Sequence, residues 1–231
     1  MLLSIDTSTR FAGVALSEDR NVIASLSWYS RQNHTAELAP AITRILEQSH
    51  IQLQEVEAIS IALGPGGFSA LKVGMSMAKG IAIGKNVPLV GVNTLDMEAY
   101  PYHDIGLTVC PILSMGRGEY AWALYSQAGG KWQQTKGPGL MKPEVLARTL
   151  PNGTLYCGEA AEELKDVLKE VSGGSAKVQG FFTSSLRLKA LAFMGCERLH
   201  NGDHDDLTTL QPFYMRRPSI SAMKPPKKVQ R

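Results

Sequence analysis

The 231-residue chain lacks the features that mark membrane-spanning and disulfide-rich proteins. It contains no uninterrupted apolar run of about 20 residues, the length that a membrane-spanning helix requires. Its start, MLLSIDTSTR, becomes polar too early for a signal peptide. The three cysteines are odd in number, isolated and outside any Cys-x-x-Cys motif, which favours a reducing compartment. We therefore expect a cytoplasmic protein with no membrane segment.

Acidic residues are missing from the end of the chain. None follows Asp206, whereas six basic residues do, and without these six the chain has 18 basic residues against 21 acidic ones. The net charge of +3 therefore comes from this segment. Its prolines disfavour regular structure. Residues 217–231 are predicted to form a basic, flexible tail, either a solvated extension or a segment that contacts RNA or an acidic partner.

Motifs of several large enzyme classes are also absent. There is no His-Glu-x-x-His, no nucleophile elbow and no Cys/His pair. The glycine turn at 64–67 fails the GxGxxG pattern, because Ser69 stands where a glycine is needed, and Lys72 lacks the neighbours that a P-loop requires. His200 and His204 have the spacing of two metal ligands on a helix, but a glycine between them and nearby aspartates predict an exposed turn.

The stretch Ala58–Asn93 has the pattern of one βαβ unit. Ala58–Leu63 is an apolar run of strand length, and the Gly-Pro-Gly-Gly cluster after it ends the strand. Apolar residues then recur at helical spacing from Phe68 to Gly84, and Pro88–Val92 is a second strand-like run. A parallel, largely buried sheet follows. The helix also carries small residues four apart, which allow close packing of the sheet or of a second protein: Ala70, Gly74, Ala78 and Ala82.

Three strands and a helix precede this unit. Leu2–Asp6, Ala12–Leu16 and Val22–Trp28 are predicted to form a meander. A helix follows over His34–Glu47, in which Pro40 is expected to introduce a kink or to mark the true start. The order β-β-β-α-β-α-β is that of the ribonuclease-H-like half of the actin-like ATPases.

The second half of the chain mixes shorter strands and helices. Strands are predicted over residues 107–113, 119–126, 131–135 and 154–157, and helices over residues 143–150 and 159–171. A last helix is predicted to begin at a cap on Ser184 or Ser185, with Leu188 and Leu191 in its apolar stripe. The fold class is therefore α/β, an actin-like fold of two lobes with mixed sheets flanked by helices, the second lobe degenerate. We divide the chain into a ribonuclease-H-like lobe, a degenerate lobe and the tail: residues 1–103, 104–216 and 217–231.

The first strand ends in a candidate nucleotide site, Asp6-Thr7-Ser8-Thr9. The actin-like fold places such a sequence at a hairpin that approaches nucleotide phosphates. The carboxylate can hold a metal-bound water, while hydroxyl and backbone N–H groups contact the phosphate. A polar turn in which the aspartate accepts hydrogen bonds from nearby N–H groups explains the same residues equally well. Asp6, Thr7, Ser8 and Thr9 are thus candidates for a vestigial nucleotide-binding site.

These segments together resemble the bacterial TsaB (YeaZ) family, relatives of the catalytic subunit TsaD. The strongest part is Gly64–Gly74, which is similar to the family's Gly-Pro-Gly-Ser-Phe-Thr-Gly-Leu-Arg-Ile-Gly. Leu3–Thr9 and His34–Pro40 resemble the family's opening strand and helix start. Arg117–Tyr120 and Pro212–Arg216 resemble two later motifs, so the similarity spans almost the whole chain.

The resemblance implies that no catalytic metal is held here. TsaD follows the same Gly-Val-Asn strand end with two histidines, four apart, which hold its metal. Thr94 and Glu98 stand at these places, and neither threonine nor a single carboxylate replaces two imidazoles. Ser114 also stands where many relatives carry aspartate. We therefore expect no catalytic residue, no metal and no cofactor of its own, with ATP acting at the level of a complex.

By resemblance, the protein is a non-catalytic partner of TsaD that joins the ATPase TsaE. The complex transfers threonylcarbamoyl to adenosine 37 of tRNA. In the absence of TsaD both a homodimer and a monomer stay open, and tRNA is contacted indirectly or through the basic tail. The family pairs through two helices, and the expected interface residues are His34, Leu38, Ile42, Phe68, Ala70, Lys72, Gly74, Met75 and Ala78. The alternative is that these faces pack on the chain's own sheet.

Two other functions stay open at this point. An independent actin-like ATPase would use Asp6 and the hydroxyls after it, although the second lobe lacks glycine-rich phosphate signals. A glycoprotease-like metallopeptidase would need the metal pair that Thr94 and Glu98 replace.

Overall fold

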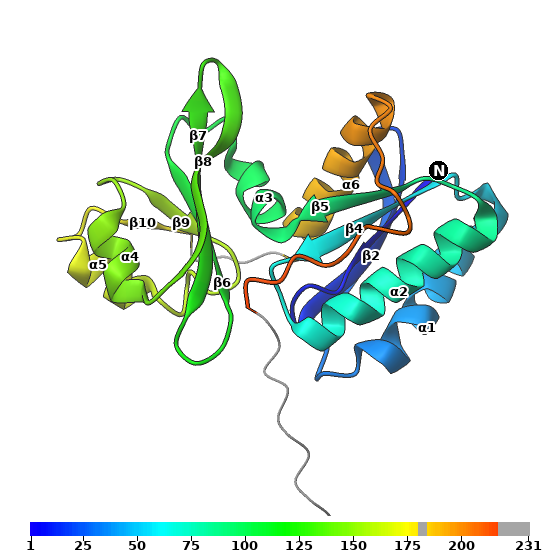
Figure 1. The fold of residues 1–231 in the computed structure, drawn as a ribbon, viewed down its shortest axis with the longest axis horizontal. Coiled ribbons are helices and arrows are strands. Elements are labelled where there is room, and N and C mark those ends of the chain that lie inside the picture. Colours follow the sequence, from blue (N-terminus) through cyan, green and yellow to red (C-terminus); the bar gives the residue numbers. More distant parts are fainter. Residues whose placement is uncertain (180–183, 217–231) are drawn as a thin grey trace, which may run out of the picture.

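The computed structural model describes residues 1–179 and 184–216, in two lobes that each contain a five-stranded sheet (Figure 1). The predicted tail, 217–231, lies outside the described residues. Among the helices described, none is both long and apolar enough to cross a bilayer.

The first sheet has the strand order β3-β2-β1-β4-β5. β1 (Leu2–Asp6), β2 (Phe11–Glu18) and β3 (Asn21–Tyr29) form the predicted antiparallel meander. β4 (Ala58–Gly64) and β5 (Leu89–Asn93) add to β1 in parallel, as expected for a βαβ unit. The carboxyl ends of β1, β4 and β5 therefore meet at one edge of the sheet.

Helices cover both faces of this sheet (Figure 1). α1 (His34–Gln48) and α2 (Phe68–Lys85) lie side by side on one face, and α6 (Ser184–His200) crosses the other. Because α1 begins at His34, Pro40 lies inside the helix and does not mark its start. The core between the sheet and the two helices is aliphatic and includes Leu3, Ile5, Val14, Leu16, Leu38, Ile42, Ile45, Ile59, Ile61 and Met75.

The second lobe repeats the connectivity of the first. Its strand order is β10-β9-β6-β7-β8, with β6 (Val109–Ser114), β7 (Tyr120–Ala128) and β8 (Lys131–Met141) antiparallel. β9 (Leu155–Cys157) and β10 (Lys177–Val178) join in parallel, as β4 and β5 do in the first sheet. The two-lobed actin-like prediction is confirmed, and the shortness of β9 and β10 is the degeneration that the sequence indicated.

Short helices complete the second lobe. α4 (Pro143–Thr149) and α5 (Lys165–Val171) pack together, whereas a helix was predicted from residue 159. Residues 158–164 instead form turns, because Gly158 has φ +91° and Ala160 N donates to Ile112 O at 3.2 Å. Two short 3-10 helices, Leu53–Glu55 and Tyr100–Tyr102, lie in connections.

Two helices join the lobes. Leu95 and Ala99 of α3 (Thr94–Ala99) pack against the second sheet, while Met97 packs against the first. α6 then returns from the second lobe to the first sheet, where Leu188 and Leu191 cover the face opposite α1 and α2. In space α6 and the segment after it, up to Tyr214, therefore lie with the first lobe, whereas the sequence-based division at residue 103 groups them with the second.

Candidate functional site

The predicted nucleotide residues gather at the end of β1, where each polar side chain has a partner within the chain. Asp6 is 1% exposed, and its Oδ1 accepts from Ser8 N at 2.9 Å and Ser8 Oγ at 2.6 Å. Thr7 Oγ1 donates to the carbonyl of Ala70 in α2 at 2.8 Å, and Thr9 Oγ1 accepts from Phe11 N at 3.1 Å. Such local bonds are those of the polar-turn alternative.

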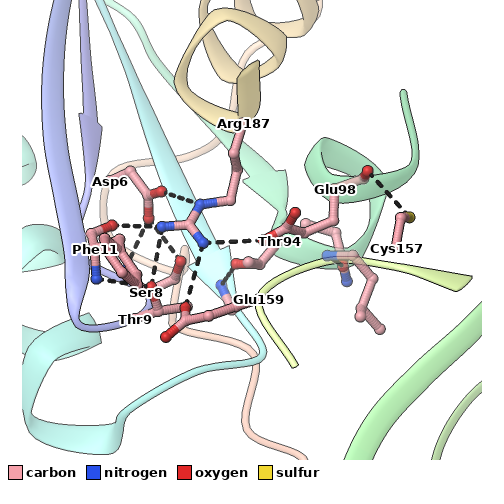
Figure 2. A network of polar contacts seen from close by, with 12 residues as sticks. Asp6, Ser8, Thr9, Phe11, Thr94, Glu98, Cys157, Glu159 and Arg187 are labelled. Atoms are coloured by element: carbon pink, nitrogen blue, oxygen red, sulfur yellow. Dashed lines mark hydrogen bonds and ion pairs between the residues drawn. The ribbon is translucent and has the colours of Figure 1, made fainter. Parts of the chain in front are cut away.

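Arg187, on α6, also contacts the turn that follows β1 (Figure 2). Its Nε donates to Asp6 Oδ2 at 2.6 Å and its Nη2 to Thr9 Oγ1 at 3.0 Å. Its Nη1 donates to Glu98 Oε1 on α3 at 2.9 Å. Arg187 is 1% exposed, and its guanidinium bonds to Asp6 Oδ2, the oxygen that Ser8 leaves free. A metal-bound water or a phosphate-bound cation would need this same oxygen.

Sequence reasoning missed Arg187 because no local pattern connects it to Asp6. The two residues are 181 positions apart. One signal was available in the sequence. Arg187 stands next to Leu188, which belongs to the apolar stripe of a helix, and a charged residue rarely faces a core. Only the return of α6 to the first sheet brings the pair together.

The cluster holds more carboxylates than cations. Glu159, at the end of β9, places Oε2 3.6 Å from Arg187 Nη1, so Asp6, Glu98 and Glu159 surround one guanidinium. Burial raises the pKa of Glu98 to about 7, although Arg187 opposes the shift. Burial by itself lowers the pKa of Arg187, but Asp6 and Glu98 outweigh it and raise that pKa above the ordinary value. Glu98 is thus the group whose charge changes near neutral pH.

Thr94 and Glu98, the positions where the family resemblance implies that metal-binding histidines are replaced, have structural roles in this fold. Thr94 Oγ1 accepts a hydrogen bond from Gly64 N at 3.1 Å and so ties α3 to the end of β4. Glu98 pairs with Arg187 and is 5% exposed. Across residues 1–179 and 184–216, no three or more His, Cys, Asp or Glu side chains lie in an arrangement suited to a metal ion.

The second lobe has a serine at the position that corresponds to Asp6. Ser114 ends β6 as Asp6 ends β1, and each precedes the hairpin to the next antiparallel strand. Ser114 is exposed, and the hairpin after it turns through Gly116, Arg117 and Gly118, all at positive φ. The end of β6 therefore supplies no carboxylate of the kind that Asp6 supplies at the end of β1.

Six of the predicted interface residues belong to the interior of the single chain. Leu38, Ile42, Gly74, Met75 and Ala78 face the first sheet, and His34, also buried, places Nε2 3.0 Å from the Thr9 carbonyl. Within the single chain these six residues are therefore buried, in keeping with the alternative that the sequence left open, and their contact with a partner stays a prediction.

Gly74 shows why the inner face of α2 needs small residues. A Cβ added to it would lie 2.2 Å from Thr7 Oγ1, so the glycine lets the helix approach the turn after β1. A larger side chain such as leucine would meet Thr7, so Gly74→Leu is expected to disturb the folded chain itself.

The outer face of α2 carries a second stripe of small residues, Ser76, Gly80 and Gly84, which is exposed. A Cβ added to Gly80 or Gly84 would meet no atom within 4 Å. Apolar side chains flank the stripe, and Ile83 nearby is 64% exposed. The stripe lies in a shallow groove lined by Thr35, Leu53, Lys72, Val73, Ser76, Met77, Gly80, Ile81, Gly84 and Lys85.

The remaining predicted interface residues lie at the first turns of α2, partly under the chain's own C-terminal segment. Tyr214 packs against Phe68 with ring centroids 4.8 Å apart and the ring planes tilted by 42°, and Lys72 Nζ lies 4.1 Å from the centroid of the Phe68 ring. Phe213 N donates to Leu63 O at 2.7 Å and holds the segment in place. Lys72 is exposed, whereas Phe68 and Ala70 are half-buried.

Comparisons with known proteins agree on one family. The family model for TsaD, tRNA N6-adenosine threonylcarbamoyltransferase, matches residues 28–222. The tRNA threonylcarbamoyladenosine biosynthesis protein TsaB of Bacillus subtilis is 27% identical over 219 residues, 93% of each chain. The TsaB of Escherichia coli is 32% identical over 148 residues, 63% of this chain and 64% of that protein. The structure of YeaZ from Pseudomonas aeruginosa superposes with a TM-score of 0.73 at 21% identity, covering 92% of this chain and 98% of the other.

Proposed function

Because the chain belongs to the TsaB (YeaZ) group of the tRNA N6-adenosine threonylcarbamoyltransferase family, we propose that it is a non-catalytic subunit of the complex that forms threonylcarbamoyladenosine in tRNA. In this role it supports threonylcarbamoyl transfer to adenosine 37 by a TsaD subunit, together with TsaE. It uses no cofactor of its own, and ATP is consumed elsewhere in the complex.

The observation that carries the non-catalytic role is the Arg187 cluster. Asp6, the one carboxylate of the candidate nucleotide site, is already bonded to Ser8 and to Arg187. Thr94 and Glu98, the positions of the two metal ligands in TsaD, bond to Gly64 and to Arg187. The groups that an ATPase or a metallopeptidase would use are therefore engaged inside the fold, which favours a subunit that acts through contact.

The contact we propose is made by the outer face of α2. Ser76, Gly80 and Gly84 leave a groove in which a helix backbone can approach closely, and Met77 and Ile81 provide apolar area beside it. A TsaD subunit is the partner that fits, because the family model shared with this chain implies corresponding helices that can pack in the same way. A homodimer formed without TsaD would use the same groove, and tRNA would be reached through TsaD or the basic tail.

Co-purification with the host's TsaD, followed by a modification assay on tRNA with TsaE and ATP, tests this function. We expect a stoichiometric complex, and loss of modification when this chain is omitted. Modification that proceeds without it would contradict the proposal. ATP turnover by the isolated chain that falls in Asp6→Ala would instead favour the independent ATPase, and zinc-dependent peptide cleavage the metallopeptidase.

A further inference from the structure

We propose that Arg187 is an internal cation that locks the two lobes at a fixed angle, so that their relative orientation is a property of the folded chain. The guanidinium bonds at once to the first sheet, through Asp6, and to α3, through Glu98 (Figure 2). Glu159, which follows β9 of the second sheet, lies 3.6 Å away and adds a third carboxylate. This role is independent of the proposed function.

The pair between Arg187 and Glu98 links the lobes because α3 is fixed to the second sheet. The carbonyl of Glu98 accepts from Cys157 Sγ in β9 at 3.5 Å. Tyr125 of β7 donates to Asp96 of α3, and Leu95 and Ala99 pack into the core of the second lobe. α3 also contacts the first lobe, through Thr94 and Met97. A rotation of the second lobe away from the first sheet would therefore carry Glu159 away from Arg187, and would either move Glu98 with it or break the bonds that α3 makes to the second sheet.

Burial makes such a rotation unfavourable. Asp6, Glu98 and Arg187 are 1%, 5% and 1% exposed, so their attraction is screened far less than that of a surface ion pair. Separating them would leave charges in a poorly solvated site without partners, which is strongly destabilising. The planar guanidinium directs different N–H groups at the two carboxylates, a geometry that a lysine cannot reproduce.

Arg198, on the same helix, provides a matched control. It also binds two carboxylates, with Nε 2.7 Å from Asp203 Oδ2 and Nη1 3.0 Å from Asp205 Oδ2. Both aspartates follow α6 and lie with the first lobe, where Asp205 N bonds to Leu89 O. Arg198 therefore stabilises the end of α6 without linking the lobes.

The distance between the lobes can be measured directly by pulsed electron spin resonance on the full chain. Spin labels would be attached through Glu47→Cys on α1 and Lys169→Cys on α5, both exposed, while the native cysteines Cys110, Cys157 and Cys196 are buried. We expect one narrow distance distribution in the parent and in Arg198→Ala, and a distribution at least twofold broader in Arg187→Ala.

Arg187→Ala leaves buried carboxylates unpaired and can fail to fold, so a second variant is needed. The triple variant Asp6→Asn, Glu98→Gln, Arg187→Met keeps the side-chain volumes and removes the charges, so it is expected to fold. It too should give the broad distribution. A width equal to that of the parent in this folded variant, or an equal broadening in Arg198→Ala, would overturn the proposal.

Discussion

A single arginine decides the chemistry available around Asp6. Asp6 sits where an actin-like fold can hold a cation, yet its Oδ2 accepts from Arg187 Nε at 2.6 Å. Burial raises the pKa of Glu98, with smaller contributions from Asp6 and Glu159, and Arg187 opposes this shift without cancelling it. Glu98 therefore holds its proton unusually tightly, and the cluster around Arg187 is sensitive to pH.

Glu98 predicts a specific pH dependence of stability. Its pKa is about 7 in the folded chain against an ordinary 4.5, so the folded state binds this proton more tightly than the unfolded state. The resulting stabilisation is complete below pH 4.5 and is lost as the pH rises through about 7. Relative to Glu98→Gln, the parent should lose up to roughly 3 kcal/mol of unfolding free energy across this range.

Urea unfolding at pH 4.5, 6 and 8 measures this effect. Glu18→Gln, at an exposed position, is the control and should follow the parent at every pH. Parallel curves for the parent and Glu98→Gln would show that Glu98 does not hold the proton as argued.

At the scale of elements, α2 has two stripes of small residues with opposite roles. Gly74, Ala78 and Ala82 face the sheet and the turn after β1, whereas Ser76, Gly80 and Gly84 face outward. Both stripes repeat every four residues, so periodicity alone could not separate them. The inner stripe sets how closely the helix packs, and the outer one leaves the groove that we assign to a partner helix.

Matched alanine substitutions separate the two stripes. Gly74→Ala places a Cβ 2.2 Å from Thr7 Oγ1, and we expect a net loss of about 1–2 kcal/mol after the gain in helix propensity. Gly80→Ala meets no atom within 4 Å and should gain about 0.5–1 kcal/mol from propensity. Denaturant unfolding of both variants checks the sign, and a stabilised Gly74→Ala would contradict the packing.

Filling the outer groove tests the partner surface. Gly80→Leu is expected to keep or raise the stability of the isolated chain while weakening its affinity for TsaD at least tenfold, because the leucine occupies the path of the partner helix. Titration calorimetry with TsaD measures the affinity. Glu170→Leu on α5, an exposed helix position in the second lobe, is the control and should bind as the parent does. Unchanged affinity in Gly80→Leu would place the interface elsewhere.

On the scale of the whole molecule, the two lobes share one connectivity but are not separate along the chain. Each sheet pairs three antiparallel strands with two parallel ones, and the last long helix returns to the first sheet. Leu188 and Leu191 fill the face of that sheet opposite α1. The first lobe is therefore completed by residues that follow the second.

This arrangement predicts the behaviour of fragments. Residues 1–103 alone would expose the apolar face that α6 covers, so we expect this fragment to be unfolded or aggregated. Joining residues 184–216 to it through a flexible linker should restore a dispersed NMR spectrum. The same linked fragment carrying Leu188→Asp and Leu191→Asp should not fold. A well-dispersed spectrum from 1–103 alone would show that the lobe needs no contribution from α6.

Much of the fold follows from the sequence by itself. The meander, the βαβ unit around Ala58–Asn93 and the two-lobed plan arise from apolar periods and glycine or proline turns, which act between neighbours in the chain. The Gly64–Gly74 motif was sufficient to indicate the family, because a glycine turn that leads into a small-faced helix is itself a local feature.

Only the tertiary structure decided which residues the function can use. It placed Gly74 inside and Gly80 outside, since the orientation of a helix depends on the sheet beneath it. In the fold, Arg187 contacts Asp6 although 181 positions separate them, and α6 packs on the first sheet although it follows the second lobe in sequence. Such contacts are set by the path of the whole chain and by burial, which no local pattern of residue types encodes.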